Sequence, residues 1–302
     1  MRKTSFTKVV LMLSLFCLLI WVCLITPIQV MAEQNIQETY GQPVGVDLDC
    51  ENTEPEIVSE DETSGLNSVL NAISPYSIIG SDNRTTINSR HATPYSAICY
   101  LVISWPNGAS GTATGFVVGY KTIATAGHCV YDKACGGWAS SIKIYYYANG
   151  NSTQKSMYAS SLASTQGYVY SDDSNYDYGV ITTSSEIGKS TKMYKMLERD
   201  WISSDLTSTI TIAGYRANVL YSMYGSIASA GTYKIYTQID TEPGQSGCPY
   251  YRKRNGYYEA IGIHNGSSGS SQNVGIKIRK SIYDYYNNYA SFSSVNSSYY
   301  MK

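Results

Sequence analysis

Residues 122–129 read Thr-Ile-Ala-Thr-Ala-Gly-His-Cys, so a short apolar strand runs directly into His128. An imidazole held at the end of a rigid strand is well placed to act as a general base. A lone histidine beside an apolar strand is, however, more often a core residue with satisfied hydrogen bonds. This stretch therefore indicates chemistry only if partner residues occur elsewhere in the chain.

Around this stretch the sequence consists of short β-branched and tyrosine-rich runs, separated by Gly, Ser and Asn turns. Such a pattern favours an all-β sandwich or barrels over an α/β sheet. One segment has helical spacing, since Ile282, Tyr285, Tyr286 and Tyr289 fall at i, i+3, i+4 and i+7. We expect an all-β domain with a C-terminal helix laid on its last barrel. The expected strands are residues 97–105, 114–118, 141–148, 178–182, 207–213, 232–239, 259–264 and 275–278.

Two further motifs supply the partners that His128 needs. Asp177 lies in Asn-Tyr-Asp-Tyr-Gly-Val-Ile (175–181), and Ser246 lies in Pro-Gly-Gln-Ser-Gly-Cys-Pro (243–249). The order His, Asp, Ser is the one that the chymotrypsin-type catalytic triad uses. Each motif is weak evidence alone, but together and in this order they predict a serine hydrolase.

The chemistry explains why these residue types belong together. A serine hydroxyl is a poor nucleophile until a neighbouring imidazole takes its proton. That imidazole needs a carboxylate on its other nitrogen to fix the tautomer and stabilise the imidazolium. Glycines around Ser246 allow a sharp turn, so we expect the backbone N–H groups of Gly244 and Ser246 to form the oxyanion hole. Losing one such donor typically costs about 10²–10³ in rate.

The first residues predict export. Arg2, Lys3 and Lys8 precede an apolar run from Val9 to Ile25, and small or modest residues follow up to Ala32. This is the order of a secretory signal peptide, which we place at residues 1–32. The alternative is a retained membrane anchor, for which the run is at the short edge. We expect a secreted, extracellular protein that does not stay at the membrane after cleavage of the signal.

An acidic segment follows, with ten Asp or Glu and no Lys or Arg between residues 33 and 76. The remainder, residues 77–302, carries nineteen bases and thirteen acids, a formal net charge of +6. A weakly apolar acidic segment cannot fold firmly alone, but it can lie against a basic partner. We expect residues 33–76 to be a propeptide that binds its own protease domain before activation; a solvated linker is the alternative.

The cysteines permit disulfides without fixing them. Four remain in the predicted protease domain, and an even number in an exported chain allows two bridges in three possible connectivities. Their spacing with the histidines matches no zinc-ligand pattern. We expect no metal and no cofactor. The four residues are Cys99, Cys129, Cys135 and Cys248.

The motifs around His128, Asp177 and Ser246 resemble those of the secreted bacterial glutamyl endopeptidases. The stretch Ser-Ile-Ile-Gly-Ser-Asp-Asn-Arg (77–84) also looks like the mature amino terminus of that family. The resemblance spans roughly residues 77–285. It implies a chymotrypsin-like double β-barrel with the active site between the barrels, and cleavage after Glu and, less readily, after Asp.

The resemblance also implies a pocket for the substrate's Glu side chain. His264, eighteen residues after Ser246, falls where these proteases form the pocket wall, and Thr241 matches the pocket's hydroxyl position. An imidazole and a hydroxyl can hold a carboxylate by charge-assisted hydrogen bonds. In family members the freed α-amino group can also reach the substrate carboxylate, which adds Ser77 to the expected site.

The sequence departs from the family pattern at two positions. Cys248 stands where a small residue, often Ser, is usual, and Ala113 stands where some relatives place a cysteine. The pairing of Cys129 with Cys135 is therefore only one option. Cys248 could be read as a catalytic thiol, but Ser246 holds the nucleophile's place between the two glycines.

These observations predict a secreted serine endopeptidase, made as a zymogen and acting on polypeptides through an acyl-enzyme. The alternatives are a protease-like toxin or binding protein with marginal hydrolysis, and a tyrosine-rich surface adhesin. We expect a monomer that binds no nucleic acid.

Overall fold

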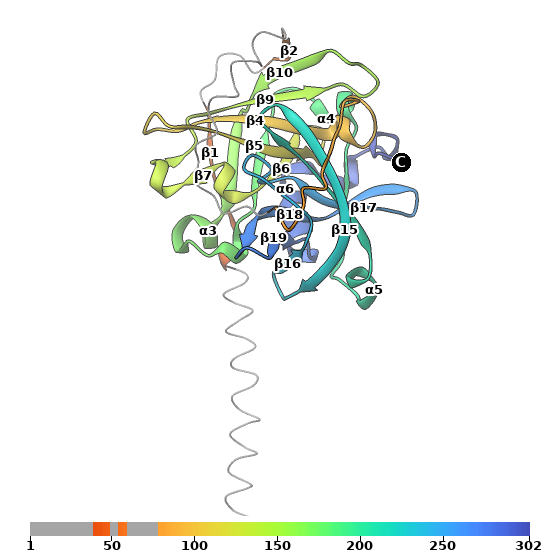
Figure 1. Cartoon of the computed structure of the whole chain (residues 1–302). Helices are drawn as coiled ribbons and strands as arrows, with labels where there is room; N and C mark the ends of the chain where they lie inside the picture. Colours follow the sequence, from red (N-terminus) through yellow and green to blue (C-terminus); the bar gives the residue numbers. More distant parts are fainter. Residues whose placement is uncertain (1–38, 49–53, 59–77) are drawn as a thin grey trace, which may run out of the picture.

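The computed structural model describes residues 39–48, 54–58 and 78–302, which form two barrel-like β-sheets with few helices (Figure 1). The predicted signal peptide and Ser77 lie outside the described residues. No helix within the described ranges is long and apolar enough to cross a membrane.

The first sheet has nine strands in the order β1–β11–β12–β6–β5–β4–β9–β10–β2, and all its neighbouring strands are antiparallel. Its inner strands are built from β-branched and aromatic residues, as expected for a buried pleated surface. They are β4 (Ile98–Ser104), β5 (Ser110–Val117), β6 (Thr122–Thr125), β9 (Ser141–Tyr147), β10 (Gln154–Tyr158), β11 (Ser161–Thr165) and β12 (Gly179–Thr182).

The second sheet has the order β13–β18–β17–β14–β15–β16–β19. Because β18 also pairs with β19, six of these strands close into a ring, which leaves no open edge between them. Its strands are β13 (Lys195–Met196), β14 (Thr209–Arg216), β15 (Val219–Ala230), β16 (Lys234–Thr237), β17 (Pro249–Arg254), β18 (Tyr257–Ser268) and β19 (Gln272–Lys277); β3 (Thr85–Thr86) pairs with β15. The prediction of an all-β architecture with two barrel-like sheets is confirmed.

Buried tyrosines join the two sheets. The ring of Tyr215 on β14 lies 5.4 Å from that of Tyr100 on β4, and both side chains are fully buried. Tyr194 contacts Phe116 of the first sheet and Tyr251 of the second at centroid distances of 5.8 and 5.2 Å. Large aromatic pairs of this kind contribute through apolar area and edge geometry. Many of the chain's tyrosines therefore belong to the core.

The predicted C-terminal helix exists as α6 (Lys280–Ala290). Its expected position on the last barrel is wrong, because α6 lies against the first sheet. The Tyr286 hydroxyl donates to the Gly179 carbonyl of β12 over 2.8 Å, and Thr122 of β6 donates to the Tyr289 carbonyl. The shorter helices are α3 (Gln166–Ser171), α4 (Ile187–Thr191) and α5 (Ser203–Leu206).

Part of the predicted propeptide adds strands to the first sheet (Figure 1). The strand β1 (Pro43–Asp47) pairs with β11 in a register from Pro43↔Thr165 to Asp47↔Ser161, and β2 (Glu56–Ile57) pairs with β10. Its described acids Asp47, Glu54 and Glu56 make no ion pair within the described chain. Main-chain pairing joins the described part of this segment to the domain, and the other seven acids of residues 33–76 lie outside the described residues.

The disulfides that the cysteine count permits are not found among the described residues, where Cys99, Cys129, Cys135 and Cys248 are free thiols. Cys99, Cys129 and Cys248 are buried. Burial raises the pKa of the Cys99 and Cys248 thiols well above their ordinary value. These side chains therefore behave as small apolar core residues, and burial keeps Cys248 from acting as a thiolate nucleophile.

Candidate active site

His128 lies in η3 (Gly127–Cys129), the short 3-10 turn that follows β6. Its backbone N–H donates to Asp177 Oδ1 over 2.8 Å, and its ring Nδ1 lies 2.9 Å from Asp177 Oδ2. Two contacts with one carboxylate fix the plane of the imidazole. The other ring nitrogen, Nε2, lies 2.7 Å from Ser246 Oγ. The structure thus brings the three predicted residues into one chain of hydrogen bonds.

Asp177 is buried between η5 (Ser174–Tyr176) and β12. Asn265 of β18 donates its Nδ2–H to the Asp177 carbonyl over 2.6 Å and accepts from the Ile276 N–H of β19 over 2.8 Å. Since β18 and β19 belong to the second sheet, Asn265 ties the loop of Asp177 to the opposite half of the molecule. Sequence reasoning did not find this role for Asn265.

The electrostatics of the pair are those of a coupled acid and base. Burial by itself would lower the pKa of His128, but the Asp177 carboxylate raises it well above the ordinary value of 6.5. Burial likewise raises the pKa of Asp177, and the charge and hydrogen bonds of His128, with Asn265, bring it below its ordinary value. Asp177 is therefore charged at neutral pH and stabilises a protonated His128.

Ser246 lies in a tight turn ahead of β17. The Gln245 N–H donates to the Glu242 carbonyl over 3.1 Å, and the Cys248 N–H donates to the Gln245 carbonyl over 3.0 Å. Gly247 and Cys248 also exchange backbone hydrogen bonds with His264 of β18, at 2.8 and 2.9 Å. The predicted oxyanion donors, Gly244 and Ser246, stand on either side of Gln245 in this turn.

Two glycines of the turn cannot carry a side chain. Gly244 and Gly247 have φ of +98° and +81°, a region that glycine adopts without strain. A Cβ on Gly247 would lie 2.1 Å from Thr125 Oγ1, and one on Gly244 would lie 2.8 Å from the Tyr215 carbonyl oxygen. The glycines that mark the sequence motif are therefore needed for both conformation and close packing.

Thr114 of β5 supports the same turn from inside, and sequence reasoning missed it. Its hydroxyl donates to the Gly244 carbonyl over 2.9 Å and accepts from the Tyr215 N–H of β14 over 2.8 Å. Its backbone N–H donates to the Ser246 carbonyl over 2.8 Å. One fully buried threonine thus joins both sheets to the nucleophile turn. A threonine in a β-rich run gives no sequence signal for this role.

The predicted pocket residues His264 and Thr241 are both fully buried. His264 Nδ1 lies 3.0 Å from the Tyr250 hydroxyl, and the two rings stack at 22°. Burial lowers the pKa of His264 to about 3, so its imidazole is neutral in the free protein. The Thr241 hydroxyl has no hydrogen-bond partner among the described residues. Tyr250, which orients His264, was not anticipated, and the predicted contribution of Ser77 falls outside the described residues.

Comparison with known proteins adds an independent line of evidence. The family model described as Trypsin matches residues 86–291. A protein named "Glutamyl endopeptidase" from Bacillus licheniformis is 34% identical over 232 residues, which cover 70% of each chain. A solved structure described as a Glu endopeptidase in complex with MPD superposes with a TM-score of 0.60 at 26% identity, and covers 71% of this chain and 99% of that one. The protease Anisep from Arthrobacter nicotinovorans, at 17% identity and a TM-score of 0.55, shares the fold.

One relative raises the question of a metal. A Bacillus subtilis protein named "Extracellular metalloprotease" is 35% identical over 222 residues, covering 71% of this chain and 70% of that one. The described part of this chain contains no group of three or more His, Cys, Asp or Glu side chains that could hold a metal ion. Among the described residues, the hydrogen-bonded His128, Asp177 and Ser246 fit a serine protease. Family match, relatives and fold agree: this chain belongs to the trypsin family of chymotrypsin-like serine proteases.

Proposed function

We propose that this protein is a secreted endopeptidase in which Ser246 is the nucleophile, His128 the general base and Asp177 its orienting carboxylate. The observation that carries this is the pair of short contacts on one imidazole, 2.7 Å to Ser246 Oγ and 2.9 Å to Asp177 Oδ2. Both distances are within reach for proton transfer and orientation. No other residue type is needed to start acyl transfer.

The reaction follows from these positions. His128 Nε2 takes the proton of the Ser246 hydroxyl while Oγ attacks the carbonyl carbon of the substrate peptide. The N–H groups of Gly244 and Ser246 stabilise the resulting oxyanion. The C–N bond then breaks, the leaving amine takes the proton from His128, and an ester remains on Ser246. Water, deprotonated by the same imidazole, hydrolyses that ester and restores the hydroxyl.

Replacing the nucleophile tests the proposal. Ser246→Ala should keep the fold and lower peptide-bond cleavage by about 10⁶-fold, since the triad acts as a unit. The assay is hydrolysis of a chromogenic peptide, with thermal unfolding as the control for the fold. A serine-directed phosphonate should label the wild-type chain at Ser246 and leave the variant unlabelled. Near wild-type turnover in Ser246→Ala would refute the mechanism, and a wild-type chain that takes no label would favour a non-hydrolytic binding protein.

We also propose that the enzyme cleaves after Glu, and less readily after Asp. The buried imidazole of His264 and the buried Thr241 hydroxyl supply donors without a fixed positive charge. An entering carboxylate would raise the pKa of His264, so that binding draws a proton onto the imidazole. A neutral pocket that becomes cationic only with its substrate avoids burying an unpaired charge. The similarity to the Glu endopeptidases supports the same preference.

Matched peptides test this preference. A peptide with one Glu should be cut on the carboxyl side of that residue, and its Gln analogue should react at least about 10²-fold more slowly because the pocket donors lose their charged partner. Thr241→Val, which removes the hydroxyl but keeps the shape, should lower the Glu-over-Gln ratio. Equal cutting after Leu or Lys would leave the triad intact and refute the pocket assignment.

Export and activation complete the proposal. We assign residues 1–32 to a signal peptide and residues 33–76 to a propeptide that is removed near Ser77. The word "Extracellular" in the name of the Bacillus subtilis relative supports export. The pairing of β1 with β11 and of β2 with β10 supports a propeptide that binds its own domain.

A further inference from the structure

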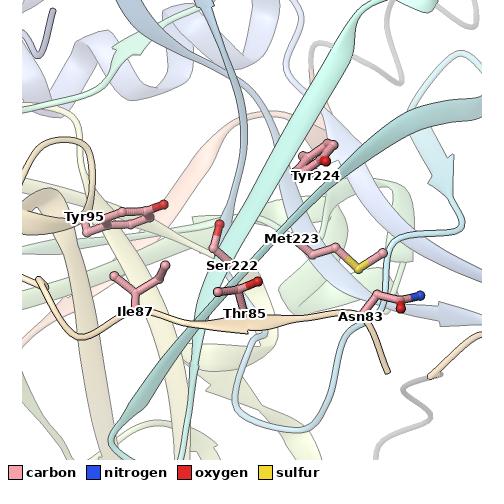
Figure 2. A pocket seen from close by; sticks show the side chains of 7 residues that line it. All are labelled: Asn83, Thr85, Ile87, Tyr95, Ser222, Met223 and Tyr224. Carbon is pink, nitrogen blue, oxygen red and sulfur yellow. The ribbon is translucent and has the colours of Figure 1, made fainter. Parts of the chain in front are cut away.

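The first residues of the predicted mature chain form a strap over the segment that leads to the nucleophile. We use "strap" for residues 78–84. The N–H groups of Ile79 and Asn83 donate to the two carboxylate oxygens of Asp240, over 2.7 and 3.1 Å, and Asp240 is almost fully buried. After the strap, β3 pairs with β15; Figure 2 shows Asn83 and Thr85 beside Ser222 and Met223 at a hollow on this face. The strap is thus fixed on a folded support at both ends.

Arg84, the last residue of the strap, points into this segment rather than into solvent. Its side chain is only 3% exposed. The guanidinium donates to Asp82 over 2.8 Å, to Glu242 through Nη2, and to Gln245 Oε1 over 3.1 Å. It also lies 4.8 Å from the centre of the Tyr221 ring. A guanidinium presents five donors in a rigid planar fork, whereas an ammonium group offers three rotatable donors at one point.

Gln245 connects this cation to the chemistry. It directly precedes Ser246, and its side chain is buried. The same amide oxygen that accepts from Arg84 also accepts from the Glu242 N–H over 2.8 Å. The Gln245 amide therefore closes a hydrogen-bonded ring across the turn of residues 242–245. Arg84 donates to the side chains of Glu242 and Gln245, the first and last residues of that turn. Gly244 and Ser246, the proposed oxyanion donors, flank the residue so held.

We propose that Arg84 is a positioning residue, which sets the oxyanion turn through Gln245 and Glu242. This rests on the function proposed above. Thr114 holds the Gly244 carbonyl from the interior, and Arg84 holds the turn from the outside. Without the guanidinium, the Gln245 amide keeps only its hydrogen bonds with the Glu242 N–H and, over 3.5 Å, the Gly214 carbonyl, so the direction of the two oxyanion N–H groups is less firmly set. Because oxyanion stabilisation depends on preorganised donors, the effect belongs to kcat rather than to substrate affinity.

Three variants test the proposal. Arg84→Met keeps the apolar stem of the side chain and removes the guanidinium, Arg84→Lys keeps the charge, and Arg216→Ala is the matched control. Arg216 also binds Glu242, over 2.9 Å, but its side chain is 44% exposed and no contact to Gln245 is found for it within the described chain. The measurements are kcat and KM per active site, counted by titration with the serine-directed phosphonate, so that loss of folded protein does not count as loss of rate.

We expect Arg84→Met to lower kcat per titrated site by up to about 100-fold, the scale of an ångström-sized misplacement, with little change in KM. Arg84→Lys should recover part of this loss. Arg216→Ala should stay within about twofold of the wild type, because an exposed ion pair contributes little. If Arg84→Met does not fold, Arg84→Lys carries the test, since it should still be slower per site than the wild type.

Wild-type kcat per site in both Arg84 variants, or an equal loss in Arg84→Met and Arg216→Ala, would overturn the positioning role while leaving the protease assignment intact. A wild-type chain that neither takes the phosphonate nor cleaves peptides would overturn both proposals.

Discussion

His128 is more basic than an ordinary histidine because the buried Asp177 carboxylate faces it. A raised pKa means that the imidazole stays protonated to a higher pH, and only the neutral form can take the Ser246 proton. We therefore expect kcat/KM to fall on the acid side with an apparent pKa above 6.5. His264, whose pKa lies at about 3, stays neutral throughout this range in the free protein. A pH profile of kcat/KM, which reports ionisations of the free enzyme, measures this.

Asp177→Asn provides the matched variant for that profile. It should lower kcat by about 10⁴-fold, because the imidazole loses its orienting partner. It should also move the acid limb to lower pH, since the negative charge that raises the pKa of His128 is gone. An acid limb at or below pH 6.5 in the wild type, or one that Asp177→Asn leaves in place, would contradict the coupling.

At the level of single residues, the sequence predicts those whose neighbours in the chain carry the signal. His128, Asp177 and Ser246 each lie in a recognisable local motif, and the structure brings them within hydrogen-bond distance. Thr114 and Asn265 could not be found this way, because their roles depend on contacts between segments 88 to 130 residues apart. Local sequence does not encode which buried carbonyl a threonine or asparagine will meet.

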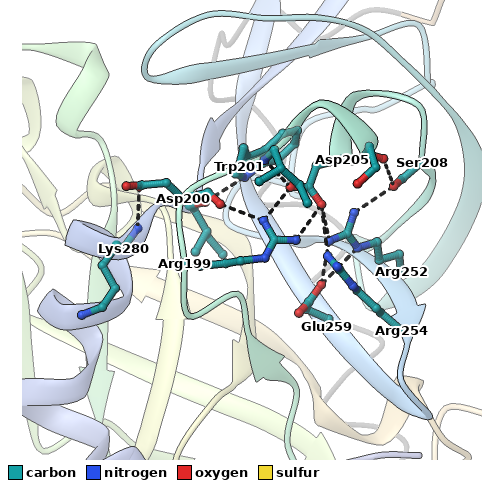
Figure 3. A network of polar contacts seen from close by, with 12 residues as sticks. Arg199, Asp200, Trp201, Asp205, Ser208, Arg252, Arg254, Glu259 and Lys280 are labelled. Atoms are coloured by element: carbon teal, nitrogen blue, oxygen red, sulfur yellow. Dashed lines mark hydrogen bonds and ion pairs between the residues drawn. The ribbon is translucent and has the colours of Figure 1, made fainter.

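Among the elements, the short helix α5 is held to the second sheet by an ionic network centred on Asp205 (Figure 3). Its carboxylate is 1% exposed and contacts Arg199, Arg252 and Arg254 at 2.7 to 3.3 Å, and it accepts the Ile202 N–H over 2.7 Å. Burial raises the pKa of Asp205, but these partners outweigh it and lower the pKa well below the ordinary value. At the end of β17, ion pairs from Arg252 and Arg254 therefore connect this strand to α5.

Removing the Asp205 charge should destabilise the protein. Asp205→Asn removes the carboxylate that three arginines share, of which Arg252 keeps a second partner, Glu259, at 2.8 Å. We expect a loss of about 3 kcal/mol in the free energy of unfolding. Because the folded-state pKa is depressed, the wild-type contribution is present above the unfolded pKa of about 3.9 and is lost as pH falls below it. Denaturant unfolding at pH 7 and at pH 3 measures both effects.

The exposed pair Lys280–Asp284, with both side chains 53% exposed, supplies the control. Asp284→Asn should change the free energy of unfolding by less than about 0.5 kcal/mol. Equal losses in the two variants, or an Asp205→Asn protein as acid-sensitive as the wild type, would show that the network does not stabilise the fold.

Elements were predictable where the pattern is local. The periods of β4, β9 and α6 are visible in the sequence and appear close to the expected bounds. The position of α6 could not be predicted, because a helix face rich in tyrosines can pack against either barrel. The helix lies on the first sheet because Tyr286 donates to the Gly179 carbonyl and Ala290 packs close to Gly119. Neither Gly179 nor Gly119 belongs to the helix, so the helix sequence does not predict these contacts.

For the molecule as a whole, residues 39–48 and 54–58, which precede Ser77 in the chain, are part of the folded unit. The Gln166 N–H of α3 donates to the Gln42 carbonyl over 2.9 Å, and the Tyr40 ring packs edge-on against Tyr176, at 5.5 Å. Tyr176 directly precedes Asp177. Residues 40–47, part of the proposed propeptide, thus add a strand to an existing sheet edge and pack beside the residue that precedes the proposed catalytic carboxylate. Composition predicted an acidic partner for a basic domain, but strand pairing depends on which edge is open and is invisible to composition.

Trimming near Tyr76 should raise activity, since only cleavage frees the α-amino group of Ser77 for the substrate carboxylate. The comparison is between the precursor from Glu33 and the chain beginning at Ser77, assayed on the same Glu peptide. A precursor already as active as the trimmed chain would refute the zymogen assignment.

Because β1 is joined by main-chain hydrogen bonds rather than ion pairs, a synthetic peptide of residues 39–58 should bind the trimmed domain with little dependence on salt, measured by fluorescence anisotropy. The same peptide with Pro at Val44 and Val46 cannot complete the ladder and should bind more weakly. Binding of the peptide that disappears at high salt would show that charge attraction, rather than strand pairing, holds this segment on the domain.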